Sequence, residues 1–431
     1  MPVRLDRSSA DFTKRFGDFL AMKRGAAADI EAATRLIVED VASRGDLALI
    51  EATRKFDRLD LDPSRLRVSA DEVAAAVKAC DRATLDALEF ARERIESFHA
   101  RQLPKDERFT DALGVELGWR WTSIESVGLY VPGGTAAYPS SVLMNAVPAK
   151  VAGVGRVVMV VPSPDGKLNP LVLAAAHLSG VSEIYRVGGA QAVAALAYGT
   201  ATIAPVAKIV GPGNAYVAAA KRLVFGKVGI DIIAGPSEVL VIADRTGNSA
   251  WIAADLLAQA EHDVNAQSIL ITDDAALAAE VERAVEAQLA TLPRADIARA
   301  SWKDFGAVIL VRNIGESVDL ANAIAAEHLE IMTADPEALS MQIRNAGAIF
   351  LGAHTPEAIG DYVGGSNHVL PTARSARFSS GLGVPDFMKR TSILKCGPDQ
   401  LRALGPAAMT LGRAEGLDAH ARSVGLRLNL S

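Results

Sequence analysis

Short apolar runs that alternate with helical segments from Val127 onward restrict this chain to a parallel α/β architecture. The runs are too short to be helices, and each is followed by a segment of helical periodicity, which is the pattern of repeated βα units. Such units form parallel sheets with right-handed crossovers. In the first series we expect strands at Val127–Val131, Val157–Val161, Ile184–Val187, Ile209–Val210 and Ile230–Ile233.

A second alternating series follows after Gly235 and Pro236 break the chain. Helices of the first series should begin near Ser140, Asn169, Ala190 and Asn214. Strands of the second series are expected at Val239–Ile242, Ile269–Ile271, Ala307–Val311, Leu329–Met332 and Ala348–Leu351. Because the two series are alike in order and length, they suggest an old duplication.

The first hundred residues show helical patterns instead. Apolar positions recur at helical spacing over Ile30–Val41, and Gly45 is placed to end that helix. Ser69 and Glu72 form the capping-box pattern that opens another helix. A long amphipathic segment then covers Leu85–Leu103 and ends before a proline.

With 431 residues, the chain exceeds what one hydrophobic core usually holds. We therefore expect an α/β fold of two Rossmann-like βα lobes with helical N-terminal and C-terminal segments. The tail should be helical from Pro398 to about Leu428, packed on a partner subunit or on its own body. The expected boundaries are an N-terminal helical segment at 1–28, a first α/β lobe at 29–126 with 236–380, a second Rossmann-like lobe at 127–235 and a C-terminal helical tail at 381–431.

Composition excludes several classes of partner. The formal net charge is -6, and no basic block is present, which argues against nucleic acid and against an anionic membrane surface. No apolar run reaches the roughly 18 residues of a membrane span, and the first residues lack the apolar core of a secretory signal. Cys80 and Cys396 are too few and too isolated for a disulfide framework. We expect a cytoplasmic protein.

Glycine-rich turns follow three of the expected strands. The chain has no GxGxxG motif, since Gly153-Val-Gly155 lacks the third glycine and precedes a strand. The three turns are instead Tyr130–Gly134, Gly188–Gln191 and Gly211–Asn214, and the last two open helices. Backbone N–H groups at such turns bind phosphates. One turn alone could be structural, whereas three favour a nucleotide or another anionic ligand.

Two polar pairs are candidates for chemistry. Gln259 and His262 lie three residues apart and share a helix face, so with a carboxylate they could complete a zinc site, although a solvated histidine is the simpler alternative. Glu327 and His328 stand where a helix gives way to a strand. A neutral imidazole is a suitable general base and a carboxylate can activate water, but a plain surface pair is also open.

Two further segments contain an acid and a histidine. Asp361 and His368 lie in a glycine-rich loop, where Asp361 is a plausible metal ligand and His368 a plausible support for it. The segment Glu415–His420 is, from spacing alone, only a polar face of the helical tail. His99 and His177, in amphipathic helices, are expected to be solvated.

Taken together, these segments resemble the histidinol dehydrogenase family over nearly the whole chain. The strings that carry the resemblance are Gly128–Gly134, Arg186–Gln191, Val210–Asn214, Ala234–Glu238, Leu257–His262, Ala326–His328, Gly364–His368 and Glu415–His420. The resemblance implies that L-histidinol is oxidised to L-histidine by two successive NAD-dependent hydride transfers, through bound L-histidinaldehyde.

The resemblance also implies roles for single residues. Glu327 and His328 would be the acid–base pair. Zinc ligands would be Gln259, His262, Asp361 and His420. NAD contacts would be Tyr130, Gln191 and Asn214. Substrate contacts would be Ser237, Gln259, His262, His328, Asp361, Glu415 and His420. The family implies a homodimer in which the C-terminal tail completes the partner's site.

Three alternatives remain open at this point. One is a related zinc–NAD dehydrogenase acting on another small polyol or amino alcohol. Another is a zinc hydrolase in which Glu327 activates metal-bound water. A third is a noncatalytic metal- or nucleotide-binding module.

Overall fold

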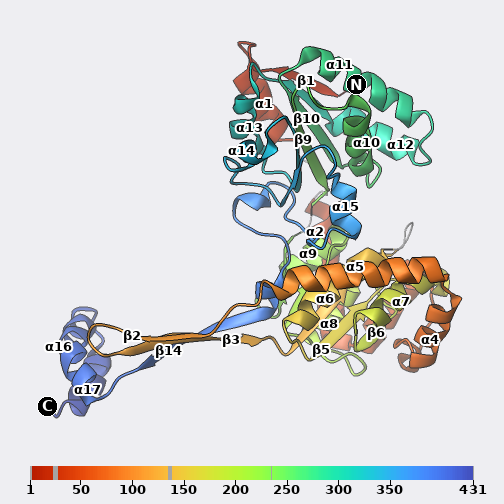
Figure 1. The fold of residues 1–431 in the computed structure, drawn as a ribbon. Coiled ribbons are helices and arrows are strands. Elements are labelled where there is room, and N and C mark those ends of the chain that lie inside the picture. Colours follow the sequence, from red (N-terminus) through yellow and green to blue (C-terminus); the bar gives the residue numbers. More distant parts are fainter. Residues whose placement is uncertain (1, 23–27, 134–137, 234, 431) are drawn as a thin grey trace. The chain divides into compact units, whose positions relative to one another are not determined.

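The computed structural model describes residues 2–22, 28–133, 138–233 and 235–430 (Figure 1). The glycine at position 134 and the alanine at position 234, both part of the expected motifs, lie outside the described residues. The chain divides into two compact units. The first comprises Met1–Gln102 and Glu125–Phe387, and the second comprises Leu103–Ile124 and Met388–Ser431.

The strands of the first unit form two sheets in which every ladder is parallel. The smaller sheet has the order β6-β5-β4-β7-β8, from β4 (Ser126–Tyr130), β5 (Arg156–Val160), β6 (Glu183–Tyr185), β7 (Lys208–Val210) and β8 (Gly229–Ile230). The larger has the order β1-β11-β10-β9-β12-β13, from β1 (Val3–Asp6), β9 (Glu238–Ala243), β10 (Gln267–Thr272), β11 (Ala307–Leu310), β12 (His328–Met332) and β13 (Ala348–Leu351).

Both series of strands expected from the alternating pattern are confirmed. In each sheet the first strand of the series lies between the second and the fourth, so the order is 3-2-1-4-5 in both, with β1 added beside β11. The shared order supports the expected duplication. It also places a reversal of strand order between β4 and β7 and between β9 and β12, where open α/β sheets form ligand crevices.

The helices of the first unit are α1 (Phe12–Leu20), α2 (Ala28–Arg44), α3 (Asp46–Asp57), α4 (Ala70–Ala79), α5 (Arg82–Ala100), α6 (Pro139–Val151), α7 (Pro170–Leu178), α8 (Gly189–Tyr198), α9 (Ala215–Val224), α10 (Ser249–Ala260), α11 (Ala275–Leu289), α12 (Ala295–Phe305), α13 (Ser317–Ile324), α14 (Pro336–Ser340) and α15 (Glu357–Tyr362). Short 3-10 turns lie at Pro63–Arg65, Pro164–Gly166, Ile314–Glu316, Ser375–Arg377 and Val384–Phe387. Across the described residues, we find no helix with the length and apolar character of a membrane span.

Side-chain caps fix several helix starts. Ser69 and Glu72 form the expected capping box at α4. The side chain of Asn169 accepts from the backbone of α7, and that of Asn214 accepts from Tyr216 N and Val217 N at the start of α9. Because the first N–H groups of a helix have no partner within it, these caps set where each helix begins.

The larger sheet is buried on both faces, which explains its almost continuously apolar strands. Along β9, Leu240 and Ile242 belong to an apolar cluster with residues of α1 and α13. The alternate residues Val239 and Val241 belong to a second cluster with residues of α10 and α11. The period of two along the strand therefore divides the core between the two faces.

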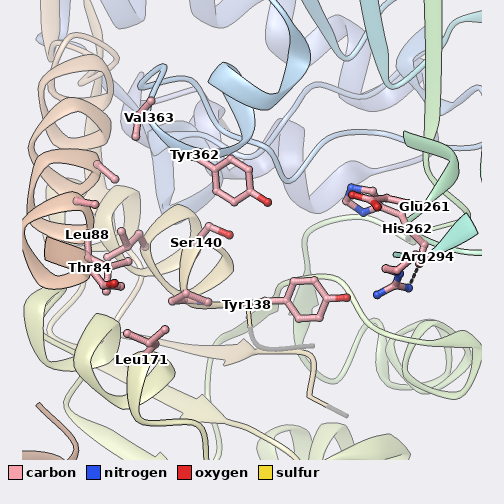
Figure 2. Close-up of a pocket in the computed structure, with 14 residues that line it drawn as sticks. Thr84, Leu88, Tyr138, Ser140, Leu171, Glu261, His262, Arg294, Tyr362 and Val363 are labelled. Atoms are coloured by element: carbon pink, nitrogen blue, oxygen red, sulfur yellow. Dashed lines mark hydrogen bonds between the residues drawn. The ribbon is translucent and has the colours of Figure 1, made fainter. Parts of the chain in front are cut away.

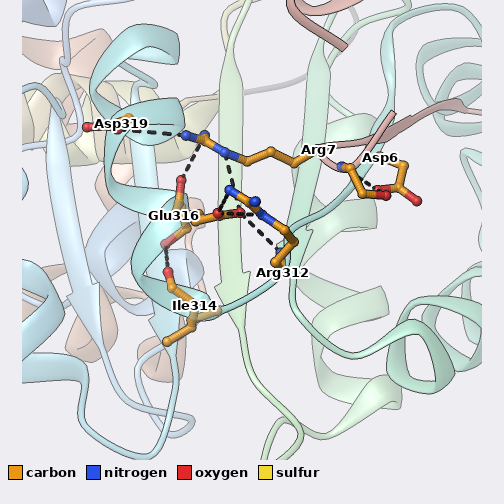
Figure 3. A network of polar contacts seen from close by, with 8 residues as sticks. Asp6, Arg7, Arg312, Ile314, Glu316 and Asp319 are labelled. Atoms are coloured by element: carbon orange, nitrogen blue, oxygen red, sulfur yellow. Dashed lines mark hydrogen bonds and ion pairs between the residues drawn. The ribbon is translucent and has the colours of Figure 1, made fainter. Parts of the chain in front are cut away.

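The expected N-terminal helical segment contains a helix, α1, but also a strand that was not expected. The described part of this segment begins with β1, which pairs with β11, and only then enters α1. Of the four residues of β1 only Leu5 is buried, so the strand gives little apolar signal. Figure 3 shows how Arg7, just after β1, holds this end of the chain: its Nε lies 3.4 Å from Glu316 Oε2, a carboxylate that also pairs with Arg312.

His99 on α5 is another correction, because it is fully buried instead of solvated. It shares the buried stripe of α5 with Ala91 and Ile95, at the spacing that aligns residues on one helix face. Its Nδ1 lies 2.7 Å from Ile95 O. His177 is exposed on α7, as expected.

The second unit joins a three-stranded antiparallel sheet to a helical pair. The sheet has the order β14-β3-β2, from β2 (Glu107–Thr110), β3 (Glu116–Ser123) and β14 (Met388–Lys395), and the packed helices are α16 (Pro398–Ala414) and α17 (Asp418–Arg427). The two helices were expected, whereas the strands were not. Their residues are mostly exposed or half-buried, so no regular apolar alternation announces them.

Candidate active site

The candidate catalytic residues lie at the amino edge of the larger sheet. His328 is the first residue of β12 and is in register with Val239 of the neighbouring β9. The chain reaches the same edge at the C-terminal end of α10, which precedes β10. Gln259 lies in the last turn of α10, and His262 follows it.

The main chain of Glu238 holds both members of the expected acid–base pair. Its N–H donates to Glu327 Oε2 at 3.0 Å, and its carbonyl oxygen lies 3.2 Å from His328 Nδ1. A carbonyl oxygen can only accept, so Nδ1 carries the proton in this contact. The lone pair of a neutral His328 is therefore on Nε2, the nitrogen that faces Asp361.

Both side chains are buried, with exposed fractions of 6% for Glu327 and 4% for His328. Burial raises the pKa of Glu327 to about 7. Burial alone would lower the pKa of His328, but the charges of Glu327, Glu357 and Asp361 outweigh it and leave that pKa well above its ordinary value. Glu327 can therefore gain or lose a proton near neutral pH, while the surrounding carboxylates favour the protonated form of His328.

Asp361 on α15 connects this pair to the glycine-rich loop. Its Oδ1 lies 3.4 Å from His328 Nε2. Burial would raise the pKa of Asp361, but His328 and the nearby His368 and His262 lower it overall, which keeps the carboxylate ionised. His368 Nδ1 lies 3.0 Å from the Asp361 carbonyl oxygen and its Nε2 lies 3.4 Å from Ser141 Oγ. The expected support of Asp361 by His368 therefore runs through the backbone.

The donor chemistry of three expected metal ligands fits a zinc ion. Gln259 is 1% exposed, and among the described residues its Oε1 has no hydrogen-bond partner, which is costly for a buried amide oxygen. His262 is exposed to solvent, yet the surrounding protein lowers its pKa by desolvation, which favours the neutral imidazole that binds metals. Asp361 supplies the ionised carboxylate. The imidazole and the carboxylate are ligand types that zinc accepts, and the amide of Gln259 offers a further oxygen donor.

No group of three or more His, Cys, Asp or Glu side chains in the described part of the chain is arranged to hold a metal ion. The expected set explains this result. It draws only His262 and Asp361 of these residue types from the first unit, while Gln259 is an amide and His420 belongs to the second unit.

A pocket of about 520 Å³ opens beside His262. Figure 2 shows His262, Glu261 and Arg294 at one end, and Leu88 of α5 with Leu171 of α7 at the other. Arg294 donates to the His262 carbonyl oxygen at 3.3 Å. The pocket therefore has a polar end at the candidate metal ligand and a wall that is largely apolar.

The residues expected to contact NAD lie at the carboxyl edge of the smaller sheet. Tyr130 ends β4 and is buried, and its hydroxyl accepts from Gly189 N at 3.0 Å. Burial raises the pKa of Tyr130 to about 12. Gln191 is buried in the first turn of α8, and Asn214 is exposed at the start of α9. Tyr130 and Asn214 therefore lie on or after β4 and β7, the two strands beside the reversal of strand order, whereas Gln191 lies after β6.

The remaining expected residues are divided between the units. Ser237 is half-buried directly before β9, next to Glu238, in the first unit. Glu415 and His420 are exposed in the second unit, at the end of α16 and in the first turn of α17.

Three buried acids of the site were not predicted from the sequence. Glu357 Oε2 lies 3.8 Å from His328 Nδ1. The Glu357 N–H donates to Glu330 Oε1 at 2.7 Å, and Glu330 in turn shares a hydrogen bond with Asp255. A charged residue within an apolar strand, as Glu330 is within β12, was the available signal. The carbonyl and N–H roles of Glu238 left no signal in the sequence.

The chain is similar to known proteins over its full length. The family model described as histidinol dehydrogenase matches residues 21–428. A histidinol dehydrogenase of Bradyrhizobium diazoefficiens is 83% identical over 431 residues, and one of Rhodopseudomonas palustris is 80% identical over 429, each covering 100% of both chains. The crystal structure of histidinol dehydrogenase from Elizabethkingia anophelis has a TM-score of 0.95 at 36% identity, covering 99% of this chain and 98% of that one. The chain therefore belongs to the histidinol dehydrogenase family.

Proposed function

We propose that the cluster around His328 is where this chain oxidises L-histidinol to L-histidine through L-histidinaldehyde, with two molecules of NAD accepting hydride. The observation that carries this assignment is the double contact of Glu238 with Glu327 and His328. One residue of main chain fixes a carboxylate and an imidazole side by side, which is the arrangement that two acid–base steps at one carbon require.

In the first oxidation, His328 Nε2 takes the proton of the substrate hydroxyl while the carbinol carbon loses a hydride to NAD. The contact of Nδ1 with Glu238 O supports this role, because it leaves the lone pair on Nε2. The aldehyde then stays bound while the reduced cofactor is exchanged.

In the second oxidation, Glu327 takes a proton from water as the water oxygen bonds to the aldehyde carbon, and His328 returns the proton gained in the first oxidation to the aldehyde oxygen, which forms the hydrate. Its pKa of about 7 suits a base that works near neutral pH. His328 then takes a hydroxyl proton of the hydrate as the second hydride leaves to NAD, and the resulting carboxylic acid loses its remaining proton to water to give the carboxylate of L-histidine.

Gln259, His262 and Asp361, with His420, would hold the zinc ion. When bound, zinc supplies a Lewis-acid centre for the imidazole and amino nitrogens of the substrate and offsets part of the Asp361 charge. Ser237 and Glu415 complete the substrate contacts that we propose. The other residues that we propose to contact the substrate are Gln259, His262, His328, Asp361 and His420.

We place NAD at the turns that follow β4, β6 and β7, where Tyr130, Gln191 and Asn214 stand. The supporting observations are the reversal of strand order between β4 and β7 and the helix start at Asn214, which presents N–H groups to phosphate. We also propose the lobe boundaries that were expected from the sequence.

We also propose a homodimer in which the C-terminal tail, carrying Glu415 and His420, completes the partner's site. Both residues are exposed, as residues that act on another subunit must be before assembly. We place the reaction in the cytoplasm, since Cys80 and Cys396 are free thiols and suit a reducing compartment.

Two substitutions separate the two oxidations. His328→Asn should slow both by about a hundred- to ten-thousand-fold, the usual contribution of a general acid–base group. Glu327→Gln should mainly slow oxidation of supplied L-histidinaldehyde. NADH formed per histidine, with either substrate, measures both effects.

His177→Asn is the matched control, because it removes an exposed imidazole from α7 of the first unit. It should leave both oxidations unchanged. If Glu327→Gln turned over L-histidinaldehyde at the normal rate, the water-activating role of Glu327 would be wrong.

A further inference from the structure

A buried ion pair stands behind the turn that opens α9. Lys221 of α9 pairs with Asp231, which follows β8, and both side chains are only 2% exposed. Removing two charges from water is unfavourable, and attraction between them repays this only when further hydrogen bonds satisfy the remaining polar atoms. The partners of those further hydrogen bonds therefore indicate what the pair is for.

Both further hydrogen bonds go to the same residue, Gly211. Asp231 Oδ2 accepts from the Gly211 N–H at 2.7 Å, and Lys221 Nζ donates to the Gly211 carbonyl oxygen at 3.0 Å. The ion pair is thus hydrogen-bonded to both the N–H and the carbonyl oxygen of Gly211, the first residue of the Gly211–Asn214 turn. The two side chains that hold this turn in place belong to residues ten and twenty positions later in the chain.

The conformation of Gly211 is one that a residue with a side chain could not adopt here. Its φ is +105°, in the region that favours glycine, and a Cβ there would lie 2.2 Å from the carbonyl oxygen of Tyr130. Gly211 is therefore pressed against the last residue of β4. The hydroxyl of Tyr130 in turn accepts a hydrogen bond from the Gly189 N–H. Tyr130 therefore contacts both of the other glycine-rich turns.

We propose that Lys221 and Asp231 are positioning residues for NAD, acting by holding the Gly211–Asn214 turn in the conformation that receives the cofactor. This inference rests on the placement of NAD proposed above. It assigns the pair a role in cofactor affinity that an ion pair serving only stability would not have.

A second ion pair of the same lobe provides the control. Arg156 and Glu183 form an ion pair, with Arg156 Nε 2.7 Å from Glu183 Oε1. They are the first residues of β5 and β6, so they lie at the amino edge of the smaller sheet. The Gly211 turn follows the carboxyl end of β7, at the opposite edge. Loss of the Arg156–Glu183 pair should lower the stability of the fold without changing the conformation of the Gly211–Asn214 turn.

The experiment compares Asp231→Asn with Glu183→Gln in the full-length, zinc-loaded enzyme. For Asp231→Asn we expect the KM for NAD and the Kd for NADH to rise about tenfold or more, since charge-assisted hydrogen bonds to the turn are lost. The KM for L-histidinol should change by less than about twofold, because the substrate contacts are elsewhere. Glu183→Gln should leave the KM for NAD unchanged, although it also breaks an ion pair of the same lobe.

Equal effects of the two variants on the KM for NAD, or none in folded Asp231→Asn, would overturn the inference. If Asp231→Asn does not fold, Asp231→Glu replaces it, because it keeps the charge but moves the carboxylate away from the Gly211 N–H. It should raise the Kd for NADH selectively, and an unchanged Kd would overturn the proposal equally.

Asn214→Ala separates this inference from the proposed cofactor site. If Asn214→Ala weakens NADH binding and Asp231→Asn does not, NAD is at the turn and the ion pair does not position it. If neither variant weakens binding, the proposed placement of NAD is itself wrong.

Discussion

Glu330 illustrates what a single residue can contribute to this site. It is 1% exposed in β12, hydrogen-bonded to Asp255, and accepts from the backbone of Glu357, which faces His328. Two carboxyl groups can hydrogen-bond only if a proton lies between them, because a carboxylate has no donor. This pair therefore keeps at least one proton, and burial raises the pKa of both groups.

The retained protons make stability depend on pH. Burial also raises the pKa of Glu357 to about 8, whereas an unfolded glutamate titrates near about 4.3. The folded state thus binds more protons than the unfolded state between these values. The stability that Glu357 contributes is fully present below the unfolded pKa and is lost as pH rises through the folded pKa. We expect the free energy of unfolding of metal-free protein to decrease from about pH 5 to about pH 8.

Glu330→Gln should flatten this decrease, because an amide replaces the protonated carboxyl and cannot ionise. Urea denaturation at a series of pH values measures the slope. Glu280→Gln, at an exposed position of α11, should leave the slope as it is. An unchanged slope in Glu330→Gln would show that the Asp255–Glu330 pair does not hold the proton.

At this scale the sequence could suggest residue types but not their partners. Glu327 and His328 are adjacent in the chain, so their candidacy was visible. Glu238 acts through its backbone, and Glu357 reaches His328 only because β12 and α15 are brought together by the fold. No spacing along the chain encodes these contacts.

Among the secondary-structure elements, those that were predictable share one physical property. The strands of the two parallel sheets are buried by helices and therefore read as apolar runs. The strands of the second unit bury little, and β14 pairs with β3 from a distant part of the sequence. Their stability comes from cross-strand contacts, such as Arg390 lying 6.0 Å from the ring of Trp121, which a local pattern does not reveal.

The capping box of α4 gives a prediction for a single element. Ser69 Oγ accepts from Glu72 N at 3.2 Å, and Glu72 Oε2 accepts from Ser69 N at 2.9 Å. Ser69→Ala should lower the free energy of unfolding by about 1 kcal/mol, the usual cost of losing such a cap. Denaturant unfolding would measure it, and kcat should not change.

Ser43→Ala is the control, since that hydroxyl contacts a carbonyl on the exposed face of α2 and caps nothing. Equal destabilisation by the two substitutions would mean that the cap does not hold α4.

Considered as a whole, the first unit contains two sheets of the same order whose proposed sites use opposite edges. The candidate NAD turns follow the carboxyl ends of β4, β6 and β7, whereas Glu327 and His328 lie at the amino edge of the larger sheet. A duplication can explain the shared order but not this difference. The difference instead follows from the Glu238–Glu327–His328 contacts, which have no counterpart among the glycine-rich turns.

The assignment of Glu415 and His420 to the partner's site can be tested by mixing inactive subunits. In the proposed dimer, each site combines His328 of one subunit with His420 of the other. A hybrid of a His420→Asn subunit and a His328→Asn subunit then has one site with both histidines and one site with neither. Random exchange of equal amounts makes half of the dimers hybrids, so about a quarter of all sites should be intact.

The mixture should therefore recover about a quarter of normal NADH formation, while each variant alone stays nearly inactive. Mass-labelled subunits would show that hybrids form. If they form and activity does not exceed that of the separate variants, each site lies within one chain. In that case His420 would have to reach His262 and Asp361 of its own subunit, and the tail would no longer make the dimer necessary for catalysis.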